Sequence, residues 1–124
     1  MLGLGTQVKG HNERRFSVPW VPPGPRLRNY IRFIRAVWDS WQNGKQLDYE
    51  GEYYQYKLTN PSFNAGPIDH PDIKVMIAAL NPFNSRLAAE VCDGIDIHHF
   101  RYVREVVLPA LYEGAPVPGK IQRN

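Results

Sequence analysis

The pattern of apolar positions over residues 73–100 predicts a strand, a helix and a second strand. Residues 73–77 form an almost continuous apolar run, which is typical of a parallel strand covered on both faces. Ala78 and Ala79 follow at its end, and an Asn-Pro pair then breaks the strand because proline has no N–H for a sheet ladder. A compact βαβ unit is therefore expected over residues 73–100.

The helix of this unit is expected directly after the Asn-Pro pair. Asn84 or Ser85 can cap its start, Leu87 and Val91 contribute to an apolar stripe, and Gly94 stands where a C-cap glycine is expected. The unpaired N–H groups of the first turn would face the end of the strand, where small residues leave room for a flat anionic ligand. The alternative is an ordinary βαβ core in which the alanines only relieve crowding.

The longest amphipathic pattern predicts a helix over residues 26–42, ended by Asn43-Gly44. Its apolar positions recur with helical spacing and indicate one buried face: Leu27, Tyr30, Ile31, Ile34, Val37, Trp38 and Trp41. The opposite face carries Arg28, Arg32 and Arg35. These arginines could contact a phosphate backbone, although a solvated helix face is the simpler interpretation.

The remaining segments are less regular. Residues 1–6 are typical of the end of a glycine-interrupted strand, and residues 8–25 are polar and proline-rich, which favours a long loop. Residues 45–71 alternate short extended, tyrosine-rich pieces with turns, and we expect an excursion before the parallel strand. A last helix is predicted over residues 102–112, kinked or shortened by Pro109.

Composition excludes several classes of protein. The chain has 124 residues, enough for one domain, and a formal net charge of +3, which tolerates an anionic ligand but predicts no nucleic-acid partner. No apolar run suggests a membrane span and no signal peptide is recognisable, so a cytoplasmic protein is expected. Cys92 is the single cysteine, and the four histidines lack the spacing of a metal site, so no metal is expected.

Several segments together resemble the middle of a luciferase-like monooxygenase, and most closely the oxidoreductases that use the deazaflavin coenzyme F420. The resemblance extends over nearly the whole chain, in order and with consistent spacing. Each motif is weak alone, and their succession is specific. The segments are LGLGTQ at residues 2–7, RLRNYI at 26–31, AVW at 36–38, GEYY at 51–54, IAALNP at 77–82 and AEVCDG at 89–94.

The resemblance implies an α/β fold, a partial (β/α)8 TIM barrel with about two to three βα units and a short β-like excursion. Residues 1–124 would form a single partial luciferase-like domain. It also implies a flavin-type cofactor, coenzyme F420 or alternatively FMN, and either hydride transfer or monooxygenation of an unknown small organic substrate.

Family likeness also suggests site residues. Gly5 and Thr6 would lie at a strand end beside the cofactor ring, Ala78 and Ala79 would pack against that ring, and His98 would end the next strand at the same mouth. Three further residues would bring backbone to the phosphate-bearing tail, namely Leu80, Asn81 and Pro82.

His11 is the candidate catalytic residue, because a loop histidine could protonate a substrate oxygen. The alternative for His11 is an ordinary surface histidine. A second hypothesis concerns the whole chain: a non-catalytic truncated remnant, or an interaction fragment that depends on a partner. An opened parallel sheet exposes strand edges, so a homo-oligomer or a complementing chain is then expected.

Overall fold

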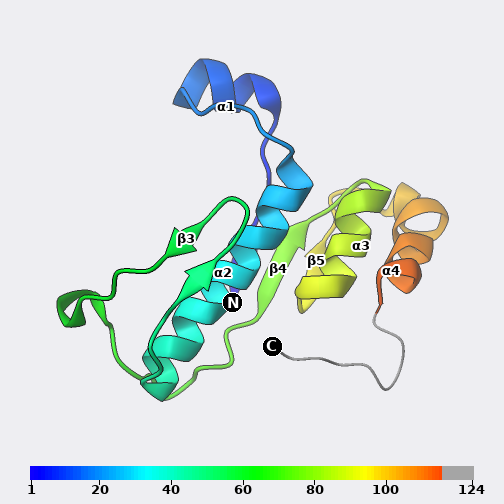
Figure 1. Ribbon diagram of the computed structural model, residues 1–124. Coiled ribbons are helices and arrows are strands. Elements are labelled where there is room, and N and C mark those ends of the chain that lie inside the picture. The colour runs from blue at the N-terminus through cyan, green and yellow to red at the C-terminus, as the bar shows by residue number, and fades with distance from the viewer. Residues whose placement is uncertain (116–124) are drawn as a thin grey trace. The chain divides into compact units, whose positions relative to one another are not determined.

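A three-stranded parallel sheet forms the centre of the first of two compact units in this computed structural model, which describes residues 1–115 (Figure 1). Within the described residues, the sheet unit contains residues 1–20 and 74–115, and the helix-hairpin unit contains residues 21–73.

The sheet has the order β1-β4-β5, with β1 at Leu2–Leu4, β4 at Val75–Ala78 and β5 at Gly94–Asp96. Both pairings are parallel. The central strand β4 is joined to β5 by helix α3 (Pro82–Val91), so the predicted succession of strand, helix and strand is confirmed. The chain is therefore a mixed α/β protein with a parallel sheet.

The two faces of the sheet differ in what covers them. Successive side chains of a strand point to opposite faces, and in β4 the side chains of Val75 and Ile77 are fully buried. Leu87 and Ala88 of α3 are buried as well, and α3 packs against both β4 and β5. The alternate residues, including Gly3, Met76 and Ala78, lie on a more open face.

Helix α3 is capped by Asn81 rather than by Asn84 or Ser85, so the predicted cap is wrong. The Asn81 Oδ1 atom accepts a hydrogen bond from the backbone N–H of Asn84 at 2.8 Å. Pro82 occupies the first helical turn, where a missing N–H is tolerated. The expected C-cap glycine is also wrong, because Cys92 is the C-cap and Gly94 begins β5.

Three short helical segments follow β5 where one helix over residues 102–112 was expected. A 3₁₀ turn, η2 (Phe100–Tyr102), leads into a π-helical segment, η3 (Val103–Val107), and then into α4 (Leu108–Gly114). Pro109 lies in the first turn of α4, so the α-helix is shortened as predicted. Helix α4 packs closely on α3, and a side chain at Gly114 would collide with the Arg86 backbone.

Helix α1 (Lys9–Phe16) corrects the expectation of a loop over the whole of residues 8–25. None of its residues is buried, so it has no apolar stripe from which hydrophobic periodicity could reveal a helix. The prolines that suggested a loop all lie after α1 in the sequence. Two non-glycine residues with positive φ flank it, Gln7 at 56° and Ser17 at 55°.

The helix-hairpin unit contains the long helix α2 (Pro23–Asn43), the hairpin of β2 (Tyr49–Glu50) and β3 (Gln55–Tyr56), and a 3₁₀ turn, η1 (Pro61–Phe63). Helix α2 starts three residues before the prediction, because proline fits the first turn, and it ends at Gly44 in the left-handed conformation, as expected. The predicted excursion over residues 45–71 thus contains an antiparallel pair.

The hairpin packs on α2 through aromatic rings and one asparagine. The centroid of the Phe33 ring lies within 6.2 Å of the ring centroids of Tyr49, Tyr54 and Tyr56. The Asn29 Oδ1 atom accepts the backbone N–H groups of Tyr53 (2.8 Å) and Tyr54 (3.0 Å), and its Nδ2 atom donates to the Tyr49 hydroxyl at 2.7 Å. Burial raises the pKa of that hydroxyl.

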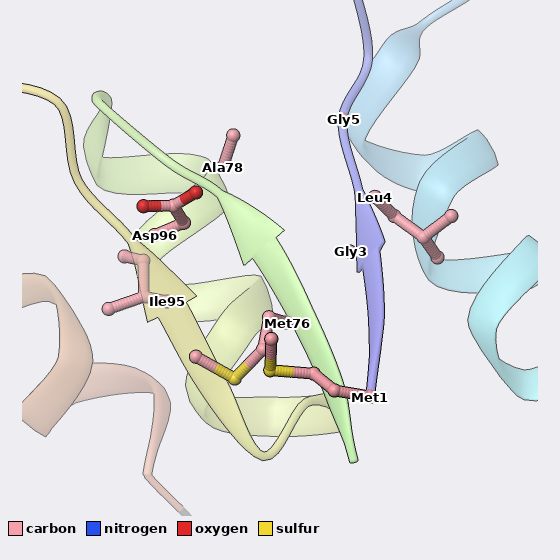
Figure 2. A pocket seen from close by; sticks show the side chains of 8 residues that line it. All are labelled: Met1, Gly3, Leu4, Gly5, Met76, Ala78, Ile95 and Asp96. Atoms are coloured by element: carbon pink, nitrogen blue, oxygen red, sulfur yellow. The ribbon is translucent and has the colours of Figure 1, made fainter. Parts of the chain in front are cut away.

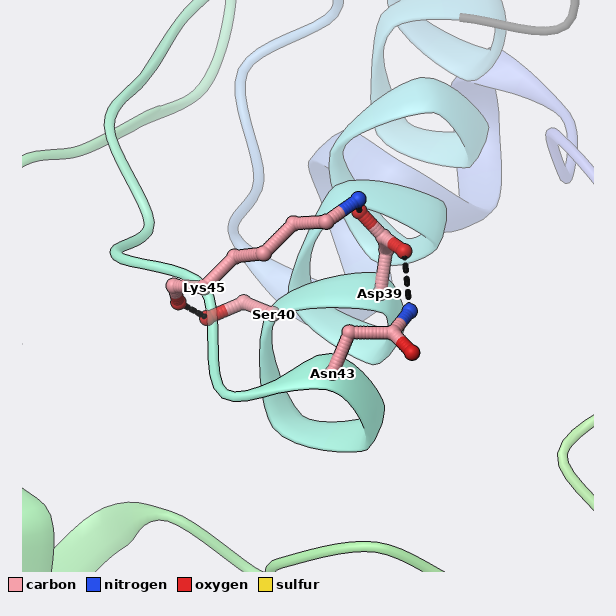
Figure 3. Close-up of polar contacts among 4 residues, drawn as sticks. All are labelled: Asp39, Ser40, Asn43 and Lys45. Carbon is pink, nitrogen blue, oxygen red and sulfur yellow. Dashed lines mark hydrogen bonds and ion pairs between the residues drawn. The ribbon is translucent and has the colours of Figure 1, made fainter.

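The end of α2 is fixed by polar contacts around Asp39 (Figure 3). Its carboxylate accepts from Lys45 Nζ at 2.8 Å and from Asn43 Nδ2 at 2.6 Å, while the Ser40 hydroxyl donates to the Lys45 carbonyl at 2.6 Å. Hydrogen bonds from Lys45 and then Asn43 lower the pKa of Asp39. These contacts hold the chain as it reverses after Gly44.

Among residues 1–115, no helix has the length and apolar character needed to cross a membrane.

Candidate functional site

A hollow of about 470 Å³ lies on the open face of the sheet (Figure 2). All three strands contribute to its lining: Gly3 and Gly5 from the first strand segment, Met76 and Ala78 from β4, and Ile95 and Asp96 from β5. The strands are parallel, so Gly5, Ala78 and Asp96 lie together at their carboxyl ends. Ligands of open and closed parallel α/β sheets bind at this edge.

The hollow exists because the strands carry small residues on this face. A Cβ atom built on Gly3 would meet nothing within 4 Å, and one built on Gly5 would meet only the Ala78 Cβ atom at 3.9 Å. Across β5, by contrast, a Cβ atom on Gly94 would come within 2.6 Å of the Met76 Cε atom. The Met76 side chain therefore fills the space at Gly94, whereas the described residues leave the space in front of Gly3 and Gly5 open.

The two alanines expected beside a cofactor ring lie on different faces. Ala78 lines the hollow, whereas Ala79 is 1% exposed and belongs to the buried side. The Ala79 backbone N–H donates to the Asp96 carbonyl at 3.3 Å and so extends the pairing of β4 with β5. Thr6 follows Gly5, and its carbonyl accepts from Asn12 Nδ2 at 3.3 Å. Gly5 and Ala78 thus lie together at the hollow, and Ala79 lies on the opposite, buried face of the sheet.

The turn from Leu80 to Pro82 has fewer available donors than the sequence suggested. Pro82 has no N–H, the Asn84 N–H is bonded to the Asn81 side chain, and the Ser85 N–H donates to the Asn81 carbonyl at 3.0 Å. The expected row of unpaired N–H groups in the first turn of α3 is therefore wrong for these residues. Leu80 is 47% exposed at this turn.

His11 lies on α1 rather than on a loop. Its Nδ1 atom is 3.2 Å from the Gln7 Oε1 atom, and the ring is exposed. It does not contribute to the lining of the hollow, and neither does His98, which is exposed two residues after β5. Among the described residues, no group of three or more histidine, cysteine or acidic side chains is arranged to hold a metal ion.

Asp96 is the one lining residue with an ionisable side chain, and the sequence did not single it out as a site residue. Its place between Ile95 and Ile97 indicates that its side chain does not share their face, but it does not tell which neighbouring strand that side chain meets. A carboxylate flanked by apolar residues on a strand points away from its neighbours, and here it points to the face that carries Ala78, its partner across the ladder.

Comparison with known proteins places this arrangement in a family. A model of the luciferase-like monooxygenases matches residues 1–116. An uncharacterized protein of Mycobacterium tuberculosis is 41% identical over 123 residues, which cover 97% of this chain and 36% of that protein. The chain thus spans about a third of the length of such relatives.

Two further relatives carry names that include a cofactor. A protein of Mycobacterium tuberculosis, assigned provisionally as a coenzyme F420-dependent oxidoreductase, is 35% identical over 106 residues, covering 76% of this chain and 28% of that protein. An F420-dependent glucose-6-phosphate dehydrogenase of Mycolicibacterium gilvum is 33% identical over 100 residues, covering 77% and 27%. With the family model matched from β1 to the end of α4, the chain belongs to the luciferase-like monooxygenase family.

Proposed function

We propose that this chain forms part of the cofactor-binding wall of a luciferase-like oxidoreductase, with coenzyme F420 as the cofactor and FMN as the alternative. Membership of the family supports an oxidoreductase, and the names of two relatives support the deazaflavin. The observation that carries the proposal is the hollow at the carboxyl ends of three parallel strands, floored by Gly3, Gly5 and Ala78.

The difference in coverage between the two faces of the sheet supports the interpretation that the hollow is part of a barrel interior. In a (β/α)8 barrel the helices cover the outer face of the strands and the opposite face lines the interior. Here α3 covers the side of Val75 and Ile77, so the face with Gly5 and Ala78 corresponds to the interior. We therefore propose that the sheet is a contiguous part of such a barrel.

The residues present fit a flat ring. A Cβ atom on Gly3 or Gly5 would enter open space, so a planar group can approach the backbone there as closely as van der Waals contact permits. The methyl group of Ala78 supplies an apolar contact beside it. When bound, the flavin-type cofactor supplies the hydride or oxygen chemistry, and the protein supplies position and exclusion of water.

The remaining predicted residues have narrower parts in this proposal. Ala79 and Thr6 hold the backbone of the strand ends, and Leu80 can cover one side of the ring because it is half exposed. The substrate would be a small organic molecule placed against the same ring. His11 would act on it only if α1 brought the imidazole to the hollow, since the ring does not line it.

Titration of the purified chain with coenzyme F420, and separately with FMN, tests the proposal. Fluorescence should change with saturation, while sedimentation reports the oligomeric state. The variant Gly5→Leu should abolish binding by filling the hollow, and the matched variant Gly10→Leu, on the exposed helix α1, should bind as the wild type does.

Two results would contradict the proposal. Absence of binding by either cofactor would reject a cofactor site formed by this chain and leave family membership as ancestry. Equal binding by the wild type and Gly5→Leu would place the cofactor elsewhere on the molecule.

A further inference from the structure

Asp96 is fixed in position at the carboxyl end of the hollow. It is the last residue of β5 and pairs with Ala78 across the parallel ladder, and its carbonyl accepts the Ala79 N–H at 3.3 Å. Figure 2 shows its carboxylate beside the Ala78 methyl group. The backbone of Asp96 is therefore held by the sheet, while its side chain lies on the face where a ligand is proposed.

The carboxylate has unused capacity as a hydrogen-bond acceptor. It is exposed, and the structure shows no hydrogen bond or ion pair from its oxygens to any residue in the described part of the chain. The other residues that line the hollow are glycine, alanine, leucine, isoleucine and methionine, Met1 included, so Asp96 carries the single ionisable side chain in this lining. An ionised carboxylate only accepts hydrogen bonds, and it has about four acceptor positions.

The charge of Asp96 acts differently on the two ends of a flavin-type cofactor. The ring carries an imide N–H at one edge, which a carboxylate can accept, whereas the tail carries a negatively charged phosphate, which a carboxylate repels. The chemistry of the hollow therefore favours the uncharged ring end.

We propose that Asp96 is a specificity-determining residue that accepts a hydrogen bond from the ring N–H of the cofactor and orients the phosphate tail away from β5. This inference rests on the proposed function, because it concerns the same hollow. It goes further by assigning a ligand contact to a residue outside the predicted site and by fixing the direction of the bound cofactor.

Riboflavin and FMN provide the test, because they share the ring and differ by the phosphate. Binding of each to the wild-type chain is compared with binding to Asp96→Asn and Asp96→Ala, with Glu105→Gln as a control that removes a negative charge from an exposed position outside the hollow. Circular dichroism verifies that each variant is folded. We expect Asp96→Asn to weaken both ligands by the same factor, about fivefold to tenfold, since charge-assisted hydrogen bonds are about twice as strong as neutral ones.

Asp96→Ala should weaken both ligands at least as much, and Glu105→Gln should leave both unchanged. Preferential strengthening of FMN by Asp96→Asn would overturn the proposed direction, because it would mean that the phosphate lies beside Asp96. Unchanged affinities in folded variants would overturn the role of Asp96 while leaving the proposed function intact. Absence of binding of coenzyme F420 as well as of both flavins by the wild-type chain would overturn both.

Discussion

Gly51 in the helix-hairpin unit and Gly5 in the sheet unit are glycines for opposite reasons. A Cβ atom on Gly51 would collide with the amide of Asn29, which fills that space and binds the hairpin backbone. A Cβ atom on Gly5 would meet only Ala78, at an ordinary contact distance. The first glycine is required by packing within the chain, and the second leaves a surface open. The space at Gly51 is thus filled by packing within the chain, whereas the described residues leave the space at Gly5 available to a ligand.

The largest expected effect separates the two faces of the sheet. Ile77→Ala removes a side chain that is fully buried, and we expect it to lower the free energy of unfolding by about 2–5 kcal/mol through lost burial and a cavity. Met76→Ala, on the partly open face, should lower it by about 1 kcal/mol or less. Urea unfolding of the full chain measures both values. Equal losses would mean that the two faces are equally buried in solution.

The next effect concerns the asparagine that joins the hairpin to α2. Asn29→Ala removes the acceptor of two backbone N–H groups and the donor to Tyr49, so we expect a loss of about 2–3 kcal/mol. Asn64→Ala is the matched control, because Asn64 is exposed and its side chain accepts a local hydrogen bond from the Gly66 N–H. Urea midpoints report the difference, and a similar loss in both variants would argue against a central role for Asn29.

The comparison of glycines is tested directly by adding a methyl group to each. Gly51→Ala should destabilise the chain by about 1–3 kcal/mol, and Gly5→Ala should change the unfolding free energy by less than about 0.5 kcal/mol. The effect of Gly51→Ala should shrink in an Asn29→Ala background, because the colliding amide is then absent. A double-mutant cycle measures this coupling, and strict additivity would contradict the collision.

The smallest effect is a pH dependence at the end of α2. The pKa of Asp39 is lower in the folded chain than its usual value of about 3.9, so its contribution is present above that value and is lost as the pH falls through the folded pKa. The side chain is 49% exposed, which limits this contribution to less than about 1 kcal/mol. The stability difference between the wild type and Asp39→Asn should disappear on acidification.

Asp69→Asn serves as the control for this measurement, since Asp69 is exposed and its side chain has no hydrogen bond to another residue within 1–115. A pH-independent difference between the wild type and Asp39→Asn would show that the ion pair with Lys45 adds nothing to stability in solution.

Hydrophobic periodicity predicted the elements that bury a face. The run from Ile73 to Ile77 and the stripe of α2 are visible in the sequence because burial selects apolar residues at regular spacing. Helix α1 buries no residue, so the same reasoning could not detect it. The turns were harder to predict from the sequence, because an Asn-Pro pair both ends one element and starts the next. Asn81-Pro82 and Asn60-Pro61 each provide an asparagine cap and a proline in the first helical turn.

The candidate site could be predicted only in part, for a geometrical reason. Resemblance directed attention to Gly5 and Ala78, and the structure brings both to the hollow. Ala79 could have been separated from Ala78 by the alternation of a strand, which sends neighbouring side chains to opposite faces. Asp96 required the register of β5 against β4, and no local pattern in the sequence contains that information.

The pairing of β1 with β4 has a consequence for the order of folding. Leu2 lies opposite Val75 in this pair, so every residue of the helix-hairpin unit belongs to the loop that the pair closes. Closing a long flexible loop loses more chain entropy than closing a short one. The contacts of Asn29 with Tyr53 and of Phe33 with Tyr56 span far shorter distances along the chain. Amides of the hairpin should therefore gain protection from hydrogen exchange before the Leu2 amide of β1, which donates to the Lys74 carbonyl, during refolding.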